Sequence, residues 1–117
     1  MTIKTMEEIK IGFEDIDYKQ LMMVEKTIWD ACMLKVKAGT TGYRGGDSGL
    51  GSRTVLEFEN DGGDMVVEVK GNDDQTEKVT FRLGGDAELR NLIAGLKFAA
   101  EVLEEQSKSG QLTIKAE

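Results

Sequence analysis

The residues with the clearest chemical potential lie in one short segment, TTGYRGGDSGLGSRT, at positions 40–54. Its five glycines let backbone N–H groups converge on a ligand, and its two arginines carry planar charged groups that suit phosphate or carboxylate. The tyrosine ring can stack on a base, and the polar side chains can bind a ribose. We therefore predict a binding site for a phosphate-bearing small molecule, formed by Tyr43, Arg44, Gly45, Gly46, Asp47, Ser48, Gly49, Gly51, Ser52 and Arg53.

Two other interpretations of this segment remain open. Arg44 could pair with Asp47 and hold an omega-like loop whose role is only structural. The loop could instead contact another protein, because connections longer than the roughly two to five residues of a hairpin turn are often functional. The string matches neither the P-loop nor the dinucleotide-binding fingerprint, so no motif names a ligand.

Catalysis and metal binding are not indicated by the residue types. The chain has no histidine, the commonest general acid or base near neutral pH, and no recognised nucleophile motif. Its single cysteine, Cys32, can neither close an internal disulfide nor form a zinc site alone, and we expect it to be buried. The sequence predicts a non-enzymatic binding protein without catalytic residues, metal or cofactor.

Charge and hydropathy limit the partners. The 22 acidic and 15 basic residues give a net charge of −7, which opposes direct binding of DNA, RNA or an anionic membrane. Any anion must therefore be captured locally. No apolar run approaches the ~20 residues that span a bilayer, and the first residues lack the pattern of a signal peptide. We predict a cytoplasmic protein.

The hydrophobic pattern predicts strands along most of the chain. Period-two alternation marks residues 7–13, 32–38 and 77–83 as strands, whereas residues 15–26 fit either a helix or a strand. Two β-rich runs, 53–60 and 65–71, flank the glycines of DGGD and predict a hairpin.

The last element predicted is a helix at about residues 86–106. Asp86 is the expected N-cap, and Glu88 lies in the first turn, where the helix dipole favours negative charge. An apolar stripe that should cover the sheet consists of Leu89, Leu92, Ile93, Leu96, Ala100 and Leu103. The prediction is a single α+β domain, residues 1–117, with an antiparallel meander of four to five strands, a C-terminal α-helix and a glycine-rich loop at about 39–53.

Three helix residues indicate self-association. Gly95, Phe98 and Val102 fall together away from the main apolar stripe. They could be buried in a wide groove within the monomer. We favour a homodimer or higher oligomer in which Gly95 permits close approach.

The chain resembles a group of viral proteins over about residues 40–103. The string GYRGGDSGLGSRT, a following acidic strand with DGG, and LGGDAEL at the start of the helix are similar to small, mostly uncharacterised proteins encoded by bacteriophages and prophages. Those proteins have a histidine where this chain has Leu50, which favours binding over catalysis here.

The resemblance implies a viral accessory protein that blocks host immunity. One form of it would capture a cyclic nucleotide or an ADP-ribose derivative, with Arg44 and Arg53 on phosphates and Tyr43 on the base. The alternative is an acidic inhibitor, similar in style to anti-CRISPR proteins, that mimics nucleic acid and binds a host nuclease. A structural, virion-associated role is the third possibility.

Overall fold

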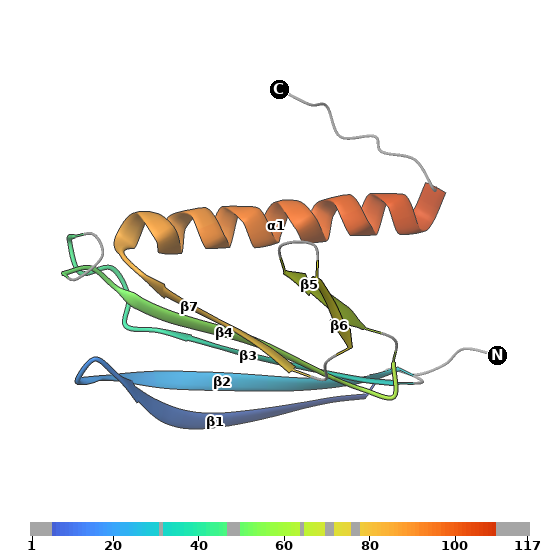
Figure 1. Ribbon diagram of the computed structural model, residues 1–117, viewed down its shortest axis with the longest axis horizontal. Helices are drawn as coiled ribbons and strands as arrows, with labels where there is room; N and C mark the ends of the chain where they lie inside the picture. The colour runs from blue at the N-terminus through green and yellow to red at the C-terminus, as the bar shows by residue number, and fades with distance from the viewer. Residues whose placement is uncertain are drawn as a thin grey trace.

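The computed structural model describes residues 6–30, 32–46, 50–63, 65–69, 72–75 and 78–109. Within them the chain forms a five-stranded antiparallel sheet, a two-stranded sheet and one C-terminal helix (Figure 1). The large sheet has the order β1-β2-β3-β4-β7, with β1 Met6–Ile16, β2 Lys19–Asp30, β3 Cys32–Thr40, β4 Arg53–Asp61 and β7 Lys78–Gly84. The small sheet pairs β5 Val66–Val69 with β6 Asn72–Gln75, and helix α1 spans Asp86–Ser109. The predicted α+β class is confirmed.

Residues 15–26, for which the sequence left helix and strand open, form the end of β1, a turn and the first half of β2. Burial alternates along β2, since Met23 is 1% exposed and Met22 is 53% exposed, as the pleat of a strand requires. Asp17 and Tyr18 make the turn with φ angles of 49° and 62°. Positive φ at both central residues is the geometry of a type I′ hairpin turn.

The predicted hairpin between residues 53–60 and 65–71 is wrong. β4 pairs with β3 on one side and with β7 on the other, while β5 pairs with β6. β7 has seven residues against four in β5, and it places Phe81 opposite Leu56. Such cross-strand apolar pairs stabilise a sheet, so the longer and more distant strand takes this edge of β4.

One face of the large sheet is apolar. Residues directly opposite each other in an antiparallel pair share a face, so the strand register shows which side chains lie together. We call the following set the apolar face: Ile9, Ile11, Phe13, Met22, Val24, Ala38, Leu56 and Phe81.

The opposite surface, which we call the charged face, carries paired charges. Lys37 and Glu14 approach to 3.2 Å there. The same face holds the small core of the structure, which consists of Leu21, Met23 and Val55. Cys32, expected to be buried, is exposed at the start of β3, because that end of the strand lies beyond this core.

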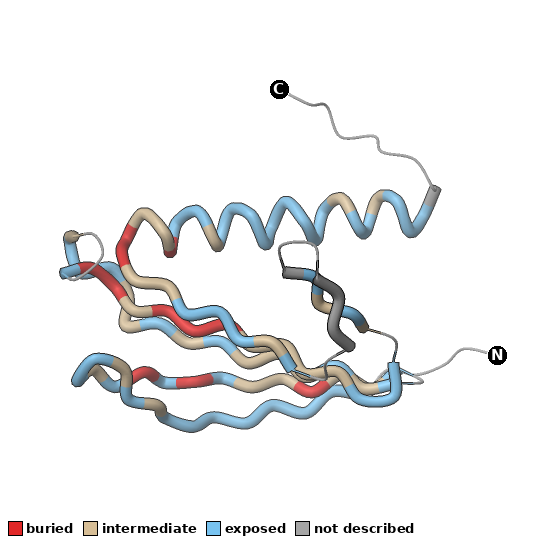
Figure 2. The backbone as a smooth tube through the Cα atoms, in the orientation of Figure 1, coloured by how far each residue is buried: buried red, intermediate tan, exposed pale blue. Residues whose placement is uncertain are grey.

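Helix α1 lies over the apolar face and is anchored mainly at its start (Figure 1). Leu89 is 5% exposed, but Leu96 and Leu103 are 41% and 67% exposed, and most of α1 beyond its first turn is exposed (Figure 2). The first part of the predicted stripe, from Leu89 to Leu96, therefore faces the sheet, and beyond Leu89 the sheet does not fully bury it. A groove of about 390 Å³ separates them, lined among others by Met22, Val24, Ala38, Leu56, Leu92 and Leu96. Within the described part of the chain, no helix is long and apolar enough to cross a membrane.

The turn between β1 and β2 offers a test of the fold. Tyr18 has a left-handed backbone and a fully exposed side chain, so Tyr18→Gly should remove backbone strain and raise the free energy of unfolding by up to about 1 kcal/mol. Denaturant unfolding at fixed protein concentration measures it. The control, Gln20→Gly within β2, should lower the same quantity by about 0.5–1 kcal/mol. Equal destabilisation by both changes would contradict the turn.

Candidate functional site

The glycine loop connects the end of β3 to the start of β4, and its base is closed by strand-like hydrogen bonds. Thr41 N–H donates to Arg53 O, and Arg53 N–H donates to Thr41 Oγ1, each over 3.0 Å. The hydroxyls of Thr40 and Thr54 also lie 3.0 Å apart. The loop proper therefore begins after Thr41, and its two ends are held side by side.

The carboxylate of Asp86 lies inside this loop. Backbone N–H groups converge on it, from Arg44 to both oxygens at 3.1 Å, from Gly45 to Oδ2 at 2.7 Å and from Ser52 to Oδ1 at 2.9 Å. Asp86 is only 7% exposed. The loop is thus an anion-binding nest of the predicted kind, but the anion it holds belongs to the chain itself.

Reciprocal contacts join the loop to the junction between β7 and α1. Asp86 N–H donates to Gly46 O at 3.0 Å, and Gly85 N–H donates to Ser52 O at 2.9 Å. The buried Ser52 hydroxyl donates to Gly85 O at 2.9 Å. A Cβ added at Gly51 would come within 2.8 Å of Gly85 Cα, so the close backbone approach requires glycine there.

These hydrogen bonds set the ionisation of Asp86. Burial acts to raise the pKa of this carboxyl, but the N–H groups of Arg44, Gly45, Ser52 and Gly46 favour the charged form more strongly. They lower the pKa of Asp86 from 3.8 to about 2. The group is therefore ionised at any physiological pH.

The predicted N-cap role of Asp86 needs correction. Its carboxylate accepts hydrogen bonds from the loop, while the helical hydrogen bond in this turn runs from Leu89 N–H to Gly85 O at 3.2 Å. No local pattern indicates the true role, because Asp86 lies 41 residues from Gly45 and 34 from Ser52. The glycines at 84 and 85 before it are the nearest hint, since they permit close backbone approach.

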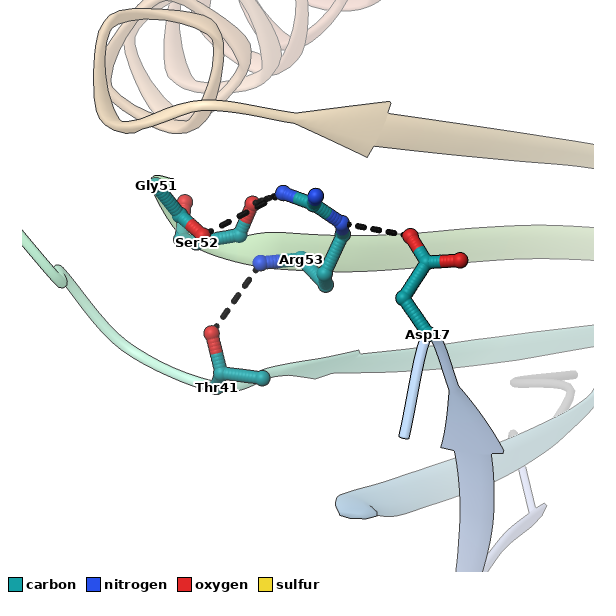
Figure 3. Close-up of polar contacts among 5 residues, drawn as sticks. All are labelled: Asp17, Thr41, Gly51, Ser52 and Arg53. Atoms are coloured by element: carbon teal, nitrogen blue, oxygen red, sulfur yellow. Dashed lines mark hydrogen bonds and ion pairs between the residues drawn. The ribbon is translucent and has the colours of Figure 1, made fainter. Parts of the chain in front are cut away.

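Arg53, predicted to bind phosphate, makes internal contacts (Figure 3). Its Nε donates to Asp17 Oδ2 at 2.8 Å, and the guanidinium also donates to the carbonyls of Gly51 at 3.2 Å and Ser52 at 3.0 Å. The side chain is 12% exposed. It ties the β1–β2 turn to the loop, so an alanine substitution would disturb folding as well as any ligand.

The remaining predicted site residues lie nearer the surface. Arg44 is exposed, and Tyr43 is 55% exposed with the guanidinium carbon of Arg90 6.0 Å from its ring centroid. This distance is at the limit of a cation–π contact. Asp47, Ser48 and Gly49 lie outside the described residues, and so does the proposed Arg44–Asp47 pair.

A second basic feature lies beside the loop. Arg53 and Arg82 line an open hollow of about 440 Å³, together with Asp17, Thr54 and Gly84. The hollow is at the same end of the sheet as the glycine loop, because Arg53 pairs with Gly84 across β4 and β7. Two arginines thus line one hollow, and the Arg53 guanidinium already donates to the one carboxylate there, that of Asp17.

The residues predicted for self-association are on α1. Phe98 is 59% exposed, and a Cβ added at Gly95 would meet no atom within 4 Å. Val102 is half-buried. The alternative in which all three are buried in a groove of the monomer is therefore wrong for Gly95 and Phe98.

Among the described residues, no three His, Cys, Asp or Glu side chains are grouped so as to hold a metal ion. Comparison with protein-family models, curated proteins and solved structures finds no match for this chain.

The Asp86 contacts imply a specific acid dependence. Because folding lowers the pKa of this carboxyl, its stabilising effect is complete above its ordinary value of 3.8 and is lost as the pH falls toward about 2. Asp86→Asn should lower stability at neutral pH and remove this part of the acid dependence, as measured by denaturant unfolding between pH 5 and pH 2. The exposed Glu101→Gln serves as control. A carboxyl carbon of Asp86 that titrates by NMR at an ordinary pKa would contradict the contacts.

Proposed function

We propose that this chain is a non-enzymatic binding protein that acts through protein–protein contact on its apolar face and the adjoining groove under α1. The observation that carries the proposal is the exposure of Ile9, Ile11 and Phe13, which are 62%, 64% and 65% exposed. Single exposed apolar residues are common, whereas large continuous apolar patches mark interaction sites.

The continuity of this patch follows from the strand register. Phe13 lies opposite Met22, and Ile11 lies opposite Val24. Met22 and Val24 also line the groove beneath α1. The patch therefore runs from edge strand β1 across β2 and under the helix.

The loop geometry supports a protein partner over a small anion at the nest. The N–H groups that could cradle a phosphate already donate to the carboxylate of Asp86. An external phosphate would have to displace the carboxylate of Asp86, which belongs to the same chain and is already hydrogen-bonded in the nest. The structural interpretation of the loop is therefore favoured, with the Asp86 carboxylate holding the loop through its backbone N–H groups.

The charged face lends little support to mimicry of nucleic acid. A phosphate mimic needs carboxylates free to meet a basic channel. Here Glu14 pairs with Lys37, and Glu57 lies 3.5 Å from Lys78. If the resemblance to phage proteins holds, the target would be a protein of bacterial defence and the location the cytoplasm of the infected cell.

The proposal is tested with the apolar dye ANS, which binds exposed apolar surface. Diluted, folded protein should bind the dye, because dilution separates any self-association that hides the patch. Phe13→Asp should reduce the signal strongly, since Phe13 is part of the patch and 65% exposed. Tyr18→Asp, at the exposed turn outside the patch, should leave it unchanged. Absence of dye binding at every dilution would mean that α1 closes onto the sheet and would refute the proposal.

A second candidate function is capture of a phosphate-bearing small molecule in the hollow lined by Arg53 and Arg82. Two guanidinium groups beside one hollow favour it, because hydrogen bonds to charged groups contribute about 1.5–3 kcal/mol each.

Calorimetry with inorganic phosphate, linear and cyclic nucleotides and ADP-ribose tests this candidate. Arg82 is exposed, so Arg82→Ala should weaken binding at least about 10-fold without loss of fold. Lys108→Ala, near the end of α1, is the matched control. Equal binding by Arg82→Ala and the wild type, or no binding of any ligand, would exclude the hollow as the site.

A further inference from the structure

We infer that the partner on the apolar face is a second copy of this chain, with the two α1 helices packed antiparallel, side by side, between the two sheets. The inference rests on the proposed function, because it names the occupant of the same apolar surface. It assigns to a dimer the part of the core that one chain leaves open.

The burial of α1 in a single chain is incomplete. This helix has 24 residues, yet Ile93 and Leu96, which line the groove, are 40% and 41% exposed, and Leu103 further along the helix is 67% exposed. Most helical stability in proteins comes from packing of the apolar face. Among the described side chains of α1 only Asp86 and Leu89, at its start, are buried, and Leu92 and Val102 are half-buried.

Charge is distributed unevenly around α1. At 100° per residue, all the charged side chains from position 90 to position 108 fall within an arc of about 100°, and they are Arg90, Lys97, Glu101, Glu104, Glu105 and Lys108. A helix that is apolar around most of its circumference is normally buried on several sides. Its own sheet can cover only one of them.

The uncharged sides of α1 match the surfaces that a second copy would bring. Leu92 and Leu96 face their own sheet across the groove. Phe98 is 59% exposed on the opposite side, where the partner's apolar face would pack, and the half-buried Val102 lies beside it. Between these sides lie Gly95 and Ala99, small residues that allow close approach of two helices.

The exposed area is sufficient for a stable dimer. Large apolar side chains more than one third exposed on the apolar face, on its extension at Leu34 and on the outer side of α1 are Ile9, Ile11, Phe13, Met22, Val24, Leu34, Phe81 and Phe98. At about 200 Å² per large side chain they expose roughly 800 Å². A standard interface buries about 800 Å² per partner. A two-fold arrangement covers the same patch on both copies and leaves no copy of it open.

Sedimentation equilibrium of the full chain over a concentration series tests the inference. The wild type should have the mass of two chains, each of 12.9 kDa. Phe98→Glu should weaken dimerisation at least about 30-fold, the effect of losing a buried interface anchor. Lys97→Glu places the same side chain one position away, on the charged side, and should leave the dimer intact.

A second variant guards against simple misfolding. Gly95 has open space around it in the single chain, so Gly95→Leu should keep or increase the helical circular dichroism while blocking close approach of the helices. It should also shift the protein toward monomer. A wild-type monomer that binds ANS would overturn the dimer and leave the proposed function standing. A wild-type monomer that binds no dye would refute both, and a Phe98→Glu protein as dimeric as the wild type would overturn the interface.

Discussion

The contact between the Asp86 carboxylate and the loop amides fixes the arrangement of three separate segments. It joins the two sides of the glycine loop, after β3 and before β4, to the junction of β7 with α1, which is more than thirty residues further along the sequence. A buried ion is tolerated only when its hydrogen-bonding capacity is met, and here backbone N–H groups meet it. The contact therefore determines where α1 starts and in which direction it leaves the sheet.

Because α1 is anchored at one end only, burial differs between the two ends of the molecule. The buried apolar cluster is small, made of Leu21, Met23 and Val55, and it lies on the charged face near the loop. The apolar face has no comparable cover, because α1 is held over it by its first turn and then runs above a groove. The two ends of the molecule thus differ. One end is closed by polar contacts and a small core, and the remainder presents exposed apolar surface.

The sequence predicted the elements better than their partners. Period-two alternation identified β1, β3 and β7, and the apolar period of α1 placed its start correctly, because these patterns are local. The pairing of β5 with β6 was missed. The glycine-containing link between β4 and β5 allows β5 to pair with β4 before it or with β6 after it. The turn at Asp17 and Tyr18 was missed because it contains no glycine. The role of Asp86 depends on contacts across more than thirty residues, which no local pattern records.

The glycine loop shows why an anion-binding sequence does not by itself indicate an external anion. A nest of N–H groups binds whichever carboxylate or phosphate is present at the highest local concentration. A carboxylate attached to the same folded chain has an effective concentration of millimolar or higher, and the pKa of about 2 keeps Asp86 charged whenever the protein is folded near neutral pH. In a chain with 22 acidic residues, an internal partner is available at many positions. The nest thus serves the fold itself. The surface that the described chain leaves uncovered is apolar.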